Sequence, residues 1–184
     1  MLQGLVDKLT ISVETIYNSL IMALFKKKSF RPPEVAETTI GLAGNDVMFL
    51  CQNLGYNEPE DTYQEAWSEY MKVQYALTLL VIADKRPDII DQYSQWLKDS
   101  TIARLKAGVD TDILRDAVSK ESWFENARHY QELPIGDIPN ELYRKLAPLL
   151  PVSIGDEEEA SIRRYLEERI PFIYKSLMKL NFEV

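Results

Sequence analysis

The sequence predicts an all-α protein, an irregular bundle of about six or seven helices, from three observations. Apolar side chains recur every three or four residues over long stretches, which is the helical period. The chain has only seven glycines among 184 residues, whereas β-sandwiches need frequent turns. Apolar residues make up 46% of the chain and charged residues 27%, which is ordinary for a protein with a packed core.

The first predicted helix runs from Leu2 to about Phe25 and carries one apolar stripe. That stripe consists of Leu2, Leu5, Val6, Leu9, Val13, Ile16, Tyr17, Leu20 and Leu24. Three lysines then complement the negative end of the helix dipole, and Pro32-Pro33 stops the helix. We therefore expect residues 1–30 to form an N-terminal amphipathic helix, a candidate arm, and residues 31–184 to form a single helical domain.

Three interpretations of this first helix remain open. It packs within its own bundle, or it pairs with another chain, or it lies in the plane of a membrane through residues 19–30. Pairing is suggested by the coiled-coil spacing of valine and leucine, and it would allow a homodimer through residues 1–25. The candidate partner-binding residues are then Leu2, Leu9, Ile16 and Leu20. Packing within the bundle is favoured, because the stripe is wider than a coiled-coil seam.

The second predicted helix spans Glu34 to about Asn53, where Gly41 and Gly44 weaken it and could divide it in two. The third begins near Pro59 and ends near Lys85.

Pro87 opens the next predicted helix, and Gly108 is placed to end it. A helix capped by Asp110 or Thr111 should then run to about Leu133. After a proline-rich loop, the last predicted helices are Asn140 to about Leu149 and Asp156 to about Leu180. Pro171 should kink the last helix or break it.

The chain has one cysteine and one histidine, which excludes metal and redox sites built from clusters of these side chains. Apolar neighbours predict that Cys51 is a buried structural thiol, which favours a reducing compartment and hence the cytoplasm. Asp7 and Glu14 interrupt the first apolar stretch, so we expect no signal peptide. The longest nearly apolar run, 75–83, is far shorter than the roughly 20 residues that span a bilayer.

Glu121, Glu125 and His129 recur at helical spacing and are the candidate metal ligands. Carboxylate di-iron bundles use Glu-x-x-His motifs on two helices, whereas Glu125 and His129 are four residues apart and no second histidine exists. A solvated helix face is therefore the favoured interpretation. No nucleophile elbow, phosphate loop or dinucleotide signature is present, and no cofactor is expected. The only possible thiol–imidazole pair is Cys51 with His129.

Charge is distributed unevenly. Residues 1–33 hold five basic side chains against two acidic ones, and the whole chain has a net charge of −8, so the remainder carries −11. An acidic body repels duplex nucleic acid and suits a basic protein partner. The aromatic series Tyr63, Trp67 and Tyr70, with Trp96 and Trp123 further along, is interpreted as core, with a binding face as the alternative.

These observations predict a cytoplasmic, non-catalytic protein-binding module that presents an acidic surface to a basic protein partner. An inhibitor, an immunity-type protein or an adaptor would fit. The first alternative is a carboxylate-rich helical-bundle enzyme or carrier that binds iron or manganese. The second is a peripheral membrane or scaffold protein anchored by the N-terminal helix.

Overall fold

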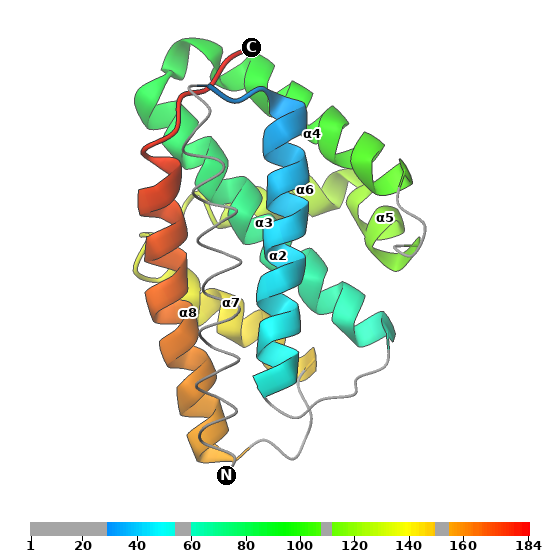
Figure 1. Cartoon of the computed structure of the whole chain (residues 1–184), viewed down its shortest axis with the longest axis vertical. Helices are drawn as coiled ribbons and strands as arrows, with labels where there is room; N and C mark the ends of the chain where they lie inside the picture. Colours follow the sequence, from blue (N-terminus) through cyan, green and yellow to red (C-terminus); the bar gives the residue numbers. More distant parts are fainter. Residues whose placement is uncertain (1–28, 54–59, 108–111, 150–154) are drawn as a thin grey trace.

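Seven α-helices and two short 3-10 helices make up the part of the chain that the computed structural model describes, which is residues 29–53, 60–107, 112–149 and 155–184 (Figure 1). Within these ranges the only β-structure is one isolated bridge. The elements are α2 (Pro32–Asn53), α3 (Glu60–Lys85), η1 (Pro87–Ile89), α4 (Ile90–Ala107), α5 (Asp112–Val118), α6 (Glu121–His129), α7 (Ile138–Leu146), η2 (Ala147–Leu149) and α8 (Asp156–Leu177). The predicted all-α bundle is confirmed.

The candidate partner-binding residues of the first predicted helix lie outside the described residues. They are Leu2, Leu9, Ile16 and Leu20. Their role therefore stays a prediction.

Helix α3 is the centre of the bundle and contacts α2, α4, α5, α6, α7 and α8 (Figure 1). Its residues 71–79 are buried without interruption, because a helix surrounded by other helices has no solvent face. Polar groups in this stretch must find partners inside the protein. Thr78 Oγ1 donates to the carbonyl of Gln74 at 2.9 Å, and the ammonium of Lys72 pairs with Glu69.

Helices α2 and α3 approach closely at Gly44. The Trp67 indole N–H donates to the carbonyl of Ile40 at 2.9 Å, and the Tyr63 hydroxyl donates to the carbonyl of Gly44 at 2.9 Å. A Cβ atom at Gly44 would lie 3.0 Å from the Trp67 ring. The division of α2 that its glycines could have caused does not occur, since α2 is continuous from Pro32 to Asn53. The missing side chain at Gly44 leaves room for the Trp67 ring. Tyr70 is buried, while Tyr63 and Trp67 are only half-buried.

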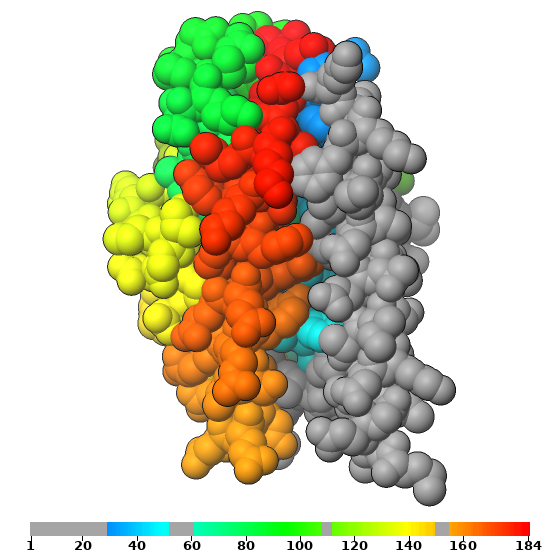
Figure 2. All heavy atoms as spheres, turned by 60° about the vertical axis from the view of Figure 1, so that its left-hand side comes forward, coloured from blue at the N-terminus to red at the C-terminus, as the bar shows by residue number. Residues whose placement is uncertain are grey.

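The two ends of the described chain are tied together (Figure 2). The Phe30 amide donates to the carbonyl of Asn181 at 2.8 Å, and the Glu183 amide donates to the carbonyl of Phe30 at 2.8 Å. Lys85 Nζ donates to the carbonyl of Met178 at 3.0 Å. Phe30 is only 2% exposed, so it belongs to the core and is not available for the membrane contact considered for residues 19–30.

The helix predicted to run from residue 110 or 111 to about 133 is in fact two helices, α5 and α6. The Ser119 hydroxyl donates to the carbonyl of Arg115 at 2.7 Å, in the turn that follows α5. The backbone of Lys120 is extended rather than helical, with φ −85° and ψ 134°. By contrast, α8 runs unbroken through Pro171. The predicted helix boundaries near Lys85, Pro87 and Asp156 are confirmed.

A buried ion pair joins α2 to α8. Arg169 Nη2 lies 2.9 Å from Asp46 Oδ1, and the Tyr165 hydroxyl donates to the same oxygen at 3.0 Å. Burial raises the pKa of the Asp46 carboxyl, and the guanidinium of Arg169 opposes that rise. The pair therefore depends on both partners being present.

Candidate protein-binding face on helix α4

Helix α4 buries one side and exposes the other. The buried residues Tyr93, Leu97, Thr101 and Leu105 are spaced by four. The opposite side is polar, with one large aromatic side chain in the middle. It consists of Asp91, Gln92, Gln95, Trp96, Asp99 and Ala103, all exposed, and we call it the Trp96 face.

Trp96 differs from the other two tryptophans of the chain. Its side chain is 42% exposed, whereas Trp123 is buried and Trp67 is half-buried and hydrogen-bonded to α2. An exposed indole offers a broad apolar surface together with one N–H donor. Tryptophan is enriched at the energetic centres of protein interfaces. Trp96 is therefore the side chain on α4 best suited to enter a partner's pocket.

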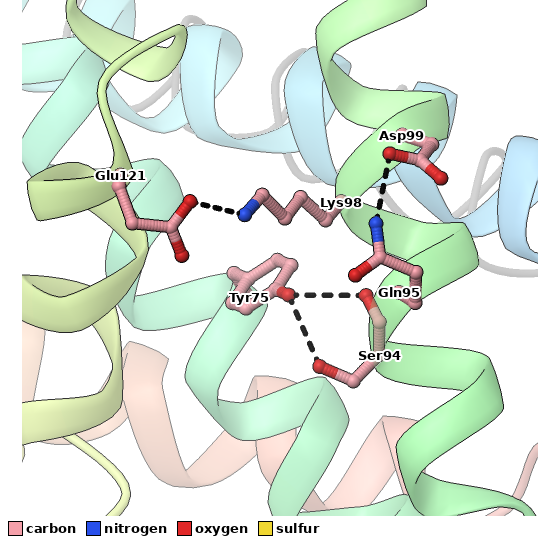
Figure 3. Close-up of polar contacts among 6 residues, drawn as sticks. All are labelled: Tyr75, Ser94, Gln95, Lys98, Asp99 and Glu121. Atoms are coloured by element: carbon pink, nitrogen blue, oxygen red, sulfur yellow. Dashed lines mark hydrogen bonds and ion pairs between the residues drawn. The ribbon is translucent and has the colours of Figure 1, made fainter.

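The cations of α4 nearest to Trp96 are engaged with other helices. Lys98 extends from α4 to Glu121 of α6 (Figure 3), and its ammonium lies 4.9 Å from the centre of the Phe124 ring. Arg104 pairs with Glu37 of α2. Lys106 is ten residues from Trp96, about 15 Å along the helix axis. These pairings leave the surroundings of Trp96 without a free cation from α4 within two turns.

The two acids of this face, Asp91 and Asp99, form no ion pair with the described residues. Asp99 Oδ1 accepts a hydrogen bond of 3.0 Å from the Gln95 amide (Figure 3), and a neutral amide does not cancel a carboxylate charge. Asp91 forms no ion pair with any residue that the structure describes. The Trp96 face thus carries an exposed indole with the Asp99 carboxylate about one turn further along the helix, and Asp91 is a second acid near the start of the same helix.

The inner side of α4 is fixed to α3. The Tyr75 hydroxyl of α3 donates to the carbonyl of Ser94 at 3.3 Å (Figure 3). Burial raises the pKa of this phenol. The Tyr75 ring also meets Phe124 edge-to-face, with centroids 5.4 Å apart. Helix α4 packs most extensively on α2, so it is held by two neighbouring helices, which favours binding because little order must be gained on association.

The predicted metal ligands lie on α6 but do not form a metal centre. Glu121 pairs with Lys98, and His129 Nε2 lies 3.9 Å from Glu141 of α7. Glu125 is exposed. No group of three or more His, Cys, Asp or Glu side chains in the described ranges is arranged to hold a metal ion. The metal-binding alternative therefore gains no support from this part of the chain.

Two further predictions about single residues need correction. Cys51 is half-buried rather than buried, although it packs against the core. Trp96 is not a core residue. The signal that places it outside was present in the sequence, because the series Tyr93, Leu97, Thr101 and Leu105 defines the buried stripe, and Trp96 lies about 100° away from Leu97 around the helix.

Among the residues that are described, no helix has both the length and the apolar character required to cross a bilayer. Comparisons with protein-family models, with curated proteins and with solved structures found no match. The function must therefore be argued from the residues themselves.

Proposed function

We propose that the protein is a non-catalytic binding protein that docks its Trp96 face onto a basic surface of another protein. One observation carries this proposal: Trp96 is exposed about one turn before Asp99, whose carboxylate forms no ion pair with the described residues, on a helix whose neighbouring cations are bound elsewhere. An inhibitor, an immunity-type protein or an adaptor would use such a face in the same way.

The two kinds of side chain would contribute differently to binding. Burial of the Trp96 ring supplies affinity, because a desolvated aromatic anchor at the centre of an interface is worth about 2 kcal/mol or more. The carboxylates of Asp91 and Asp99 supply selectivity for lysine and arginine and accelerate encounter. The net charge of −8 adds long-range attraction to the same partner.

A cytoplasmic location belongs to this proposal. It is supported by the presence of a single cysteine, Cys51, which cannot form an intrachain disulfide, since proteins without disulfides are typical of reducing compartments.

The test begins with capture of partners from lysate of the source cells by the full chain. A captured basic protein is then purified, and its affinity is measured by calorimetry. Trp96→Ala should weaken binding by about thirtyfold or more, the equivalent of a 2 kcal/mol anchor. Asp91→Asn with Asp99→Asn should slow association and reduce its dependence on salt.

The matched control is Met48→Ala on α2, because Met48 is also 42% exposed but lies on another helix. It should leave the affinity unchanged. Equal affinity of the Trp96→Ala and Met48→Ala proteins would disprove the proposed face. Failure to capture any basic protein would remove the proposed partner class.

A further inference from the structure

A hollow of about 320 Å³ lies where α3, α5, α6 and α7 with η2 meet. This is the lower end of the size range of small-molecule sites. Its lining combines apolar side chains with charged ones of both signs: Glu65, Ser68, Glu69, Lys72, Ile113, Ala117, Lys120, Ser122, Trp123, Asn126, Lys145 and Leu149. It shares no residue with the Trp96 face.

The buried part of this lining is well ordered. The Trp123 indole N–H donates to Ser68 Oγ at 2.9 Å, and both side chains are buried. Lys72 is only 9% exposed and its ammonium pairs with Glu69. These two charges cancel each other, so the hollow's net charge is decided by its remaining ionic side chains.

Those remaining side chains leave an excess of positive charge. Lys120 precedes α6 and Lys145 belongs to α7, so two different elements bring ammonium groups to one hollow. Neither lysine forms an ion pair with the described residues. Glu65 is the one other acid in the lining besides Glu69, and it offsets only one of these two lysines.

The amino end of α6 adds to this positive field. Helix α6 begins at Glu121, and no side chain caps its first turn. Lys120, Ser122 and Trp123, which surround this helix end, all line the hollow. A helix amino end carries partial positive charge and presents backbone N–H groups to anions.

From these observations we infer that the hollow is a binding site for a small organic anion. Its phosphate or carboxylate group lies between the ammonium groups of Lys120 and Lys145 at the amino end of α6. Its apolar part contacts Ile113 and Leu149. The inference is independent of the proposed protein partner, because the site lies on other helices and has the opposite local charge.

The three tryptophans allow a direct test in the full chain. Each indole N–H gives one signal in a ¹H–¹⁵N spectrum, and the three rings lie at different places: Trp67 between α2 and α3, Trp96 on α4 and Trp123 in the hollow. The chain is titrated with inorganic phosphate and, separately, with succinate, at constant ionic strength set with sodium chloride. A saturable shift of the Trp123 signal, with the other two unchanged, is the expected result.

Two double variants distinguish a specific anion site from nonspecific attraction to positive charge. Lys120→Gln with Lys145→Gln should weaken the saturating anion by about tenfold or more, because two charge-assisted contacts are lost. The control, Lys106→Gln with Lys175→Gln, removes the same charge from exposed positions outside the hollow and should leave binding unchanged.

The pattern of results decides the outcome. Saturation with phosphate alone assigns a phosphate ligand, and saturation with succinate alone assigns a carboxylate ligand. No saturation with either anion would overturn the inference. So would equal shifts of all three indole signals, or equal weakening by the two double variants, since both would indicate an adventitious ion only.

Discussion

The α2–α8 contact and the α4–α6 contact each contain an ion pair, but the two pairs lie in different surroundings. In the first, the Asp46 side chain is 3% exposed and accepts hydrogen bonds from Arg169 and Tyr165. In the second, the Glu121 side chain is 65% exposed and meets Lys98 near the surface (Figure 3). A cation paired with a carboxylate is therefore expected to have very different consequences for folding at the two places.

The difference shows where this protein depends on polar contacts and where it does not. A buried charge that loses its partner cannot recover hydration, whereas an exposed charge exchanges its partner for water at little cost. Polar groups between α2, α3 and α8 should thus be required for stability. Those on the outside of α4 are available for binding.

The largest effect should follow removal of the buried acid. Asp46→Ala leaves the Arg169 guanidinium largely buried without its carboxylate, and should lower the free energy of unfolding by about 3 kcal/mol. Urea denaturation followed by circular dichroism measures this. In the double variant Asp46→Leu with Arg169→Met, much of the loss should be recovered, because no charge stays buried. If Asp46→Ala lowers the free energy of unfolding by less than about 1 kcal/mol, the pair contributes no more than an ordinary surface salt bridge.

The two described glycines of α2 should respond to the same substitution with opposite signs. Gly44→Ala puts a methyl group 3.0 Å from the Trp67 ring and should destabilise by about 1 kcal/mol, since overpacking outweighs the gain in helix propensity. Gly41 is exposed and has open space at its Cβ position, so Gly41→Ala should stabilise by about 0.5–1 kcal/mol. Thermal unfolding of both proteins tests the pair, and a shared sign would contradict the close contact at Gly44.

A third comparison removes one hydroxyl from each of two tyrosines. The Tyr130 hydroxyl is buried with no hydrogen-bond partner in the described structure, so Tyr130→Phe should stabilise by up to about 1 kcal/mol. The Tyr63 hydroxyl donates to the carbonyl of Gly44 at 2.9 Å, so Tyr63→Phe should destabilise by about 1 kcal/mol. Denaturant midpoints measured side by side give the answer. Destabilisation by Tyr130→Phe would mean that its hydroxyl has a partner after all.

The smallest effect belongs to the exposed pair. Glu121→Gln removes the carboxylate that meets Lys98 and should change the free energy of unfolding by about 0.5 kcal/mol or less. The change should fade as salt is added, since exposed charges are screened. A loss as large as that of Asp46→Ala would show that the α4–α6 contact behaves as an interior one, and would end the contrast between the two pairs.

Both proposed sites involve exposed charged side chains, as the Lys98–Glu121 pair does, and the two sites differ from each other in the sign of their charge. The Trp96 face presents carboxylates around an aromatic ring, whereas the hollow presents the ammonium groups of Lys120 and Lys145. A basic protein and a small anion would therefore be sorted to different places on one molecule. The Lys98–Glu121 pair links the two elements that carry these sites, α4 and α6.

Local patterns along the chain were enough to predict the fold class and most helix boundaries. Proline at position 87 fixes a backbone angle and lacks a donor, which favours the break between α3 and α4 that the sequence predicted. The acids after Asp156 favour a helix start through the helix dipole, which is also a local effect. The net charge that suggested a basic partner is a property of composition alone.

Packing between helices determines which glycine forms a contact, where the helix after residue 111 divides, and which charged side chains form ion pairs. Gly44 lies against the Trp67 ring, and the separate helices α5 and α6 both bond to α3, through Leu114 and Trp123. Trp96 stands beside uncompensated acids because Lys98 and Arg104 reach partners on other helices. Local sequence patterns show the spacing of apolar residues and the helix propensity of each residue. Burial and charge pairing depend on side chains that are far apart along the chain.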